Sequence, residues 1–137
     1  MIKQKTLSSF KKEAWSLFSK IVRLRDATDG TNRCVTCKQI YPIKNLQAGH
    51  FIPGRHNAVL FDLRQVWPQC YVCNFRKHGR WVEYREFMIK KYGEHEVEQI
   101  IAESKKTVKL SRTDYADMIL KFSAILHGME GKELWNG

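Results

Sequence analysis

Four cysteines in two C-x-x-C pairs constrain this 137-residue chain more than any other feature. The pairs are Cys34 with Cys37 and Cys70 with Cys73. Two such pairs, a few tens of residues apart, can present four thiolates tetrahedrally to one Zn²⁺. The alternatives are two disulfides or four buried thiols. Disulfides are disfavoured because the N-terminal sequence MIKQKTLSSF lacks the apolar core of a signal peptide, which indicates a reducing, cytoplasmic location. We therefore predict a structural zinc.

The chain is strongly basic. Lysine and arginine number 24 against 14 aspartates and glutamates, which gives a formal net charge of +10. Such an excess favours a polyanionic partner, with nucleic acid as the leading candidate. A soluble domain that happens to be basic is the plain alternative, so the charge supports a nucleic-acid partner without establishing one. No apolar run is long enough to span a membrane, and we expect no membrane partner.

The length leaves room for one α+β domain over residues 1–137. Apolar residues recur at helical spacing over residues 8–25 and predict an N-terminal helix. The metal-binding core is expected over residues 33–92. A further helical pattern covers residues 94–128, where Gly128 is expected to end the last helix.

Local signals divide the core and the C-terminal part further. Short apolar or β-prone segments at Leu46–Ile52, Val59–Phe61 and Gln65–Trp67 predict a small β-hairpin. Gly93 interrupts the helical pattern that follows the second cysteine pair. The sequence Ser111-x-x-Asp114 is typical of a capping box at the start of the last helix.

Three motifs in residues 34–79, CVTC, LQAGHF and QVWPQCYVCNFRKHG, together resemble the HNH branch of the ββα-metal nucleases. In that branch a histidine ends the first strand, a polar residue, usually Asn, stands five positions before the second knuckle, and an Asn or His opens the helix behind it. Those positions fall here at His50, Gln65 and Asn74. The step Cys73-Asn74-x-x-Lys77 is recurrent in the zinc-containing version. The resemblance implies a zinc-stapled ββα-metal core flanked by helices.

A closer resemblance links the chain to the phage NinG, or Rap, family of recombination proteins, over roughly residues 10–101. It is carried by AGHF, Arg55, Phe61-Asp62, PQCxxCN, Tyr84, Tyr92-Gly93 and Val97. It implies a phage-encoded endonuclease, working in the host cytoplasm, that cuts branched DNA recombination intermediates such as D-loops and Holliday junctions.

Hydrolysis of a phosphodiester needs a base for the attacking water and positive charge at the phosphoryl and leaving oxygens. A neutral His50 suits the role of general base, because an unperturbed histidine has a pKa of about 6.5. Asn74 and His78 stand four residues apart, so at the start of a helix they would share one face and bind one ion. Colicin-type HNH nucleases use this spacing. The ion is expected to be Mg²⁺ or Mn²⁺, although Asn74 is also a good helix N-cap.

Two positions depart from the HNH pattern. The residue before the base histidine is often an acidic or histidine ligand, but here it is Gly49, a glycine that the NinG family shares. Asp62 is the nearest carboxylate between the knuckles, and an ordinary hairpin role suits it equally well. Gln65 stands where Asn is usual, and its longer amide is expected to orient the loop of His50.

Basic side chains surround the predicted site. Arg55, Arg76, Lys77 and Arg80 are candidates for binding DNA phosphates, although a solvated charged face explains them as well. Symmetric cleavage of a junction would suit a homodimer. Two other functions stay open: a non-catalytic zinc-containing nucleic-acid-binding module, and a zinc-stapled adaptor that binds protein. His50, Asn74 and His78 together favour the nuclease, because a binder needs no base beside a metal pair.

Overall fold

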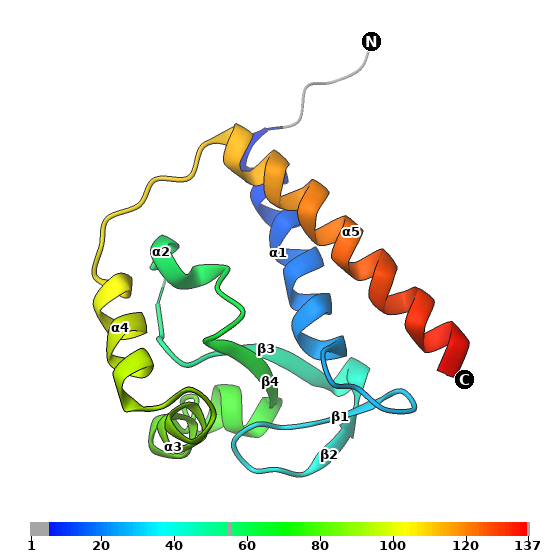
Figure 1. Ribbon diagram of the computed structural model, residues 1–137, viewed down its shortest axis with the longest axis vertical. Coiled ribbons are helices and arrows are strands. Elements are labelled where there is room, and N and C mark those ends of the chain that lie inside the picture. The colour runs from blue at the N-terminus through cyan, green and yellow to red at the C-terminus, as the bar shows by residue number, and fades with distance from the viewer. Residues whose placement is uncertain (1–5, 55, 137) are drawn as a thin grey trace. The chain divides into compact units, whose positions relative to one another are not determined.

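The computed structural model describes residues 6–54 and 56–136, with side chains as far as residue 129 (Figure 1). It is a mixed α/β structure of helices and two small antiparallel hairpins. Backbone contacts divide it into two compact units, Val22–Val108 and the pair of terminal segments Met1–Ile21 and Lys109–Gly137. None of the helices in the described part of the chain is both long enough and apolar enough to cross a membrane.

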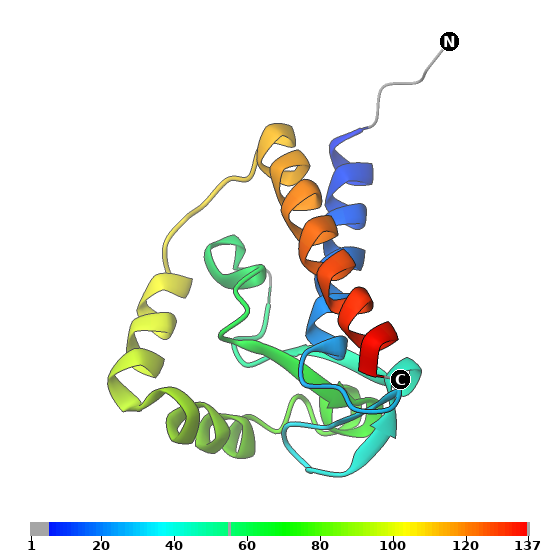
Figure 2. The ribbon, with the colours of Figure 1, turned by 45° about the vertical axis from the view of Figure 1, so that its right-hand side comes forward.

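The terminal unit consists of most of α1 (Leu7–Leu24) and of α5 (Arg112–Asn136), which lie side by side (Figure 2). The rings of Phe18 and Phe122 pack 5.4 Å apart between them. The predicted helix over residues 8–25 is confirmed by α1 to within one residue at each end.

The capping box at the start of α5 is also confirmed. The Asp114 carboxylate accepts from the Ser111 N–H at 2.8 Å, and the Ser111 hydroxyl oxygen accepts from the Asp114 N–H at 3.1 Å. The predicted end at Gly128 is wrong, because α5 continues to Asn136. Gly128 lies inside a helix, where a glycine lowers stability without stopping the turn.

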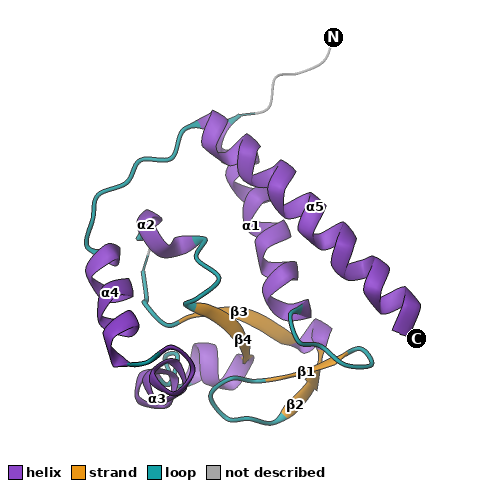
Figure 3. Ribbon diagram, viewed as in Figure 1, coloured by secondary structure: helices purple, strands orange, loops and turns teal. Residues whose placement is uncertain are grey.

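The larger unit contains both hairpins (Figure 3). Strands β1 (Thr31–Arg33) and β2 (Ile40–Pro42) pair on either side of the first cysteine pair, and the turn η1 (Ile43–Asn45) follows them. Strands β3 (Leu46–His50) and β4 (Val66–Cys70) form the second hairpin. Its register places Leu46 opposite Cys70 and His50 opposite Val66.

The hairpin predicted between the knuckles is thus present, with one correction. Val59–Phe61, expected to be β-prone, lies in and directly after the short helix α2 (Asn57–Leu60). The apolar Val59 side chain is 1% exposed there. A short apolar run does not distinguish a strand from a buried helical turn, and the run was too short for its periodicity to decide.

Helices α3 (Trp81–Tyr92) and α4 (Glu94–Ser104) complete the larger unit and pack against its hairpin core. Gly93 separates them with a φ of 88°, a backbone angle that favours glycine, so the predicted interruption is confirmed. The core of this unit joins residues of α3 and α4 to residues from the loop and strands of the second hairpin: Phe51, Val59, Trp67, Tyr84, Met88, Val97 and Ile100. The second hairpin is therefore anchored by α3 and α4.

Candidate functional site

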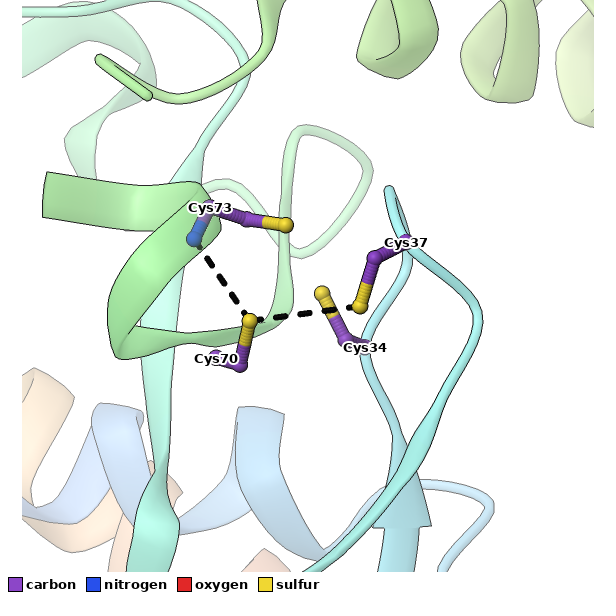
Figure 4. A group of neighbouring side chains, drawn as sticks. All are labelled: Cys34, Cys37, Cys70 and Cys73. Carbon is purple, nitrogen blue, oxygen red and sulfur yellow. Dashed lines mark hydrogen bonds between the residues drawn. The ribbon is translucent and has the colours of Figure 1, made fainter. Parts of the chain in front are cut away.

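The four cysteine sulfurs form one cluster (Figure 4). All four sulfur atoms lie within 4.8 Å of one another. Cys34 and Cys37 come from the turn between β1 and β2, and Cys70 and Cys73 come from the end of β4 and the helical turn η2 (Val72–Arg76). Two segments that are far apart in the sequence thus meet at one point.

The cluster has the dimensions of a tetrahedral metal site. Four sulfurs at about 2.3 Å from a central Zn²⁺ would be about 3.8 Å apart. The Cys37 and Cys70 sulfurs are 3.9 Å apart. The Cys73 N–H points at the Cys70 sulfur at 3.5 Å, and the Arg80 Nε donates to the Cys73 sulfur at 3.1 Å. Donors aimed at sulfur stabilise thiolates, and the four side chains fit a structural metal such as zinc.

The thiol pKa values differ within the cluster. Burial raises the pKa of Cys34, but hydrogen bonds from the backbone of Cys37 and from the Thr36 side chain outweigh burial and bring the pKa to about 6. Burial raises the pKa of Cys73 to about 12. Since metal-bound thiolates are deprotonated, binding of a cation would release protons from this cluster, and its affinity would fall in acid.

His50 lies at the end of β3 and is half-buried. Its Nε2 lies 3.1 Å from the carbonyl oxygen of Leu60. Since a carbonyl oxygen only accepts, Nε2 carries the proton in this bond, and Nδ1 is the basic nitrogen of the neutral ring. Burial lowers the pKa of His50 below its usual value of 6.5, partly opposed by the bond to Leu60. The ring is therefore oriented and neutral at neutral pH.

Gln65 is completely buried and fastens the loop that begins at His50. Its side-chain oxygen accepts from the Ile52 N–H at 2.8 Å, and its Nε2 donates to the Val59 carbonyl at 2.7 Å. The Tyr84 hydroxyl adds a bond of 2.6 Å to the Gly49 carbonyl on the other side of His50. Both polar atoms of the Gln65 amide are thus engaged with the protein, so this side chain is placed to position the loop.

A glycine is needed at position 49 because the side chain of Gln69 occupies the space that a Cβ would take. A Cβ added at Gly49 would lie 2.6 Å from Cδ of Gln69 and 2.8 Å from its Cγ, and closer still to its Oε1. Gln69 is itself fully buried, and its Nε2 donates to the Thr36 hydroxyl and to the Gly79 carbonyl, both at 3.0 Å. The space that an acidic side chain would need at Gly49 is therefore filled by an amide that joins the first knuckle to the turn after the second.

The Oε1 atom of Gln69 is buried and has no hydrogen-bond partner among the described residues. The Oε1 atom lies close to the Gly49 backbone, where only a weak C–H contact is available.

Asp62, the nearest carboxylate between the two knuckles, is bound by Arg64: Nη2 of Arg64 lies 2.6 Å from Oδ2 of Asp62. This ion pair gives Asp62 an ordinary structural role beside the second hairpin.

Asn74 and His78 are not on one continuous helix. η2 ends at Arg76, and His78 follows in a turn with a φ of 53°. The expectation that both side chains share a helical face is therefore wrong, because a residue with left-handed backbone leaves the helical repeat. Asn74 donates from Nδ2 to the Gln47 Oε1 at 2.7 Å, which ties η2 to β3. His78 is exposed.

The basic candidates have different surroundings. Arg76 and Lys77 are exposed, whereas Arg80 has its Nε on the Cys73 sulfur. Arg55 lies outside the described residues. A pocket of about 740 Å³ borders the first knuckle and the Trp67 ring. It is lined by basic side chains that sequence reasoning missed: Arg25, Arg33, Lys38, Lys90 and Lys91. Asp26, Glu83 and Glu86 also line it, so its charge is mixed.

Among the described residues, the four cysteines are the one group of three or more His, Cys, Asp or Glu side chains close enough to bind a common metal. Any second cation bound by the described residues would have to rely on fewer protein side chains, completed by water and phosphate. Mg²⁺ is commonly bound in that way.

The fold and the site define a mixed α/β protein with a candidate four-cysteine metal centre, built from the turn of the first hairpin and from the end of β4 with η2. The chain also matches, over residues 1–132, the model of a family described as Bacteriophage Lambda NinG protein. It therefore belongs to the NinG family. No curated protein matches the chain, and neither does any solved structure.

Sequence reasoning assigned no role to four polar or aromatic residues of this region. Gln47 and Gln69 stand inside the motifs LQAGHF and PQCxxCN but were assigned no role, although Gln69 precedes a metal-ligand cysteine on a strand whose alternate residues face the same side. Trp81, at the start of α3, is 50% exposed, and its ring is stacked on that of Phe51 with the ring centroids 6.0 Å apart. Tyr71 lies between the two cysteines of the second C-x-x-C pair.

Proposed function

We propose that this chain is a metal-dependent HNH endonuclease that hydrolyses phosphodiester bonds in branched DNA. The observation that carries the proposal is the state of His50: a neutral, oriented imidazole at the end of a strand, with Nδ1 as its basic nitrogen. Two further facts support it. β3, β4 and η2 follow in the order strand, strand, helical turn, and the chain belongs to a phage family that is related to recombination.

The residues of the loop would act together on the attacking water. His50 would accept its proton at Nδ1, while the Leu60 carbonyl holds the ring by Nε2. Gln65 would keep the loop in place through Ile52 and Val59. Arg76 and Lys77, both exposed, would neutralise DNA phosphates on either side of the scissile bond.

A bound Mg²⁺ or Mn²⁺ would supply positive charge to the phosphoryl oxygens and the departing 3′ oxygen. The candidate protein ligand is the amide oxygen of Asn74, whose Nδ2 is held by Gln47; His78, which leaves the helical repeat and is exposed, does not share a helical face with it. A short set of protein ligands suits Mg²⁺, which retains water and is completed by substrate phosphate. The cysteine cluster, with zinc bound, would have a structural role, because all four of its positions are taken by cysteine.

A non-catalytic nucleic-acid-binding module is the second candidate. It is favoured by the side chain of Gln69, which occupies the room above Gly49 where an acidic ligand would otherwise project. In that case His50 and Gln65 would maintain the loop, and the basic residues would bind DNA without cutting it.

The test is incubation of the purified protein with labelled linear duplex, single strands, D-loops and four-way junctions, with Mg²⁺, with Mn²⁺ and with EDTA. We expect cutting of branched DNA that EDTA abolishes. Replacing His50 by Ala should lower the cleavage rate by about 10²-fold or more. Zinc content and DNA binding should be unchanged. His95→Ala, an exposed histidine on α4 of the same unit, is the matched control and should cleave at the parent rate.

Asn74→Ala should respond differently, because it would weaken cation binding, and part of its lost activity should return at higher Mg²⁺ or Mn²⁺. DNA binding should weaken steeply with salt and depend little on sequence. Cleavage by His50→Ala at the parent rate would refute the base assignment. Binding without cutting under every metal condition would establish the non-catalytic module, and absence of binding to any DNA would favour a protein adaptor.

A further inference from the structure

Three large apolar side chains are exposed on one helical turn. Tyr71 is 47% exposed, Val72 is 43% exposed and Phe75 is 64% exposed. All three lie at or within η2, where Cys73 is the buried residue and points into the cysteine cluster. The metal site takes the inner side of this short turn, and the aromatic side chains are left on the outside. Exposed apolar groups gathered in this way commonly mark a binding surface.

The two rings form a flat surface. Tyr71 and Phe75 are stacked with centroids 5.2 Å apart and planes inclined by 17°. They are four residues apart, a spacing that brings side chains on a helical turn together. Since each ring covers the other on one side only and both stay about half exposed, the pair presents π-faces and edges to solvent.

Cations flank the pair. The Arg76 guanidinium carbon lies 6.0 Å from the centroid of the Tyr71 ring, and Lys77 follows directly. Neither makes an ion pair with any acidic side chain in the described part of the chain. Aromatic platforms beside unpaired cations are the combination that binds nucleobases with their phosphates, because the ring stacks on the base and the cation meets the backbone.

We propose that Tyr71 and Phe75 form a stacking platform for a nucleobase that is unpaired or unstacked at a DNA branch point. In intact duplex each base is covered on both faces by its neighbours, so a platform gains nothing unless a stack is broken. At a branch, an end or a single strand, an open base face is available. The platform would therefore favour branched over linear DNA, and Arg76 and Lys77 would bind the adjoining phosphates. This inference rests on the proposed function in taking DNA as the partner.

The experiment measures the affinities of the full chain for a four-way junction and for linear duplex of the same length, in EDTA so that no strand is cut. Phe75→Ala and Tyr71→Ala should each weaken junction binding by about tenfold, within the range for loss of one stacked base. Binding to linear duplex should change less than threefold. Val72→Ala, an exposed aliphatic residue in the same turn, is the matched control and should leave both affinities unchanged.

Tyr71 stands between two metal-ligand cysteines, so zinc per chain is measured for every variant. Phe75→Leu, which keeps an apolar side chain and removes the ring, is the second variant and should still lose junction affinity. A junction containing 2-aminopurine at the branch adds a direct readout: its fluorescence should be quenched by the parent protein and less by Phe75→Leu.

Three results would overturn the platform. Equal losses on junction and duplex would indicate a general role in folding or charge. Unchanged junction affinity in folded, zinc-loaded Phe75→Leu would remove the stacking role while leaving the nuclease proposal intact. A loss caused equally by Val72→Ala, with a smaller mass in light scattering, would identify the patch as a protein interface between copies. If the parent itself binds no DNA, the proposed function fails first.

Discussion

Replacing Gly49 by Ala should be one of the most destabilising single-methyl changes in this chain. The new Cβ would overlap the Gln69 side chain, including its Cγ at 2.8 Å, so rotation of the terminal amide alone would not relieve the contact. The whole side chain would have to leave, and its bonds to Thr36 and Gly79 would be lost. Two hydrogen bonds at about 1 kcal/mol each, with about 1 to 3 kcal/mol for overpacking, give a loss of about 3 to 5 kcal/mol.

The assay is urea unfolding at fixed free zinc, followed by circular dichroism, with a double-mutant cycle between Gly49 and Gln69. In the Gln69→Ala background the atoms that clash with the new Cβ are absent, so Gly49→Ala should lower the free energy of unfolding little further. Gly128→Ala is the matched control, because Gly128 is exposed on α5 and no described atom lies within 4 Å of its added Cβ. That control should stabilise by about 0.5 to 1 kcal/mol. A Gly49→Ala loss below about 1 kcal/mol, or one that is the same in both backgrounds, would refute the reasoning.

Two further predictions concern the metal and the pH. Cys70→Ser should abolish the bound metal, which we expect at about one zinc per chain, and unfold the larger unit, because metal binding is part of its folding free energy; metal analysis and circular dichroism would test this, and a folded, metal-free variant would contradict it. Since the folded-state pKa of His50 lies below its usual 6.5, the unfolded state binds the extra proton more readily, and stability should fall as the pH drops below about 6.5. His50→Gln should lose that part of the pH dependence in urea unfolding at pH 5 and 7.5, whereas an unchanged slope would contradict it.

The features that the sequence predicted well are those fixed by local chemistry. The 3.6-residue repeat in α1, the capping box at Ser111 and the positive φ at Gly93 each depend on a few neighbouring residues. The meeting of the two cysteine pairs was predictable because two C-x-x-C pairs at this spacing are typical of one four-thiolate metal site.

What the sequence did not predict depends on contacts between distant residues. Because η2 ends at Arg76, Asn74 and His78 do not lie on one helix. No local signal in the sequence indicates that His78 has a left-handed backbone conformation. From the sequence, Gly49 looked like the loss of a metal ligand. In the structure, a glycine is needed there because the side chain of Gln69, twenty residues away on the neighbouring strand, fills the space beside it. The exposure of Tyr71 and Phe75 follows from Cys73 pointing inward, which only the assembled cluster determines.

The five residues of β4 connect the two ends of the candidate site. At one end Cys70 belongs to the metal cluster, and at the other Val66 pairs with His50. Gln69, next to the metal ligand, packs over the residue that precedes His50. The geometry around His50 is thus coupled through β4 to assembly of the cysteine cluster. If the chain is the endonuclease proposed above, an incompletely assembled copy would lack activity and would leave the surrounding DNA uncut.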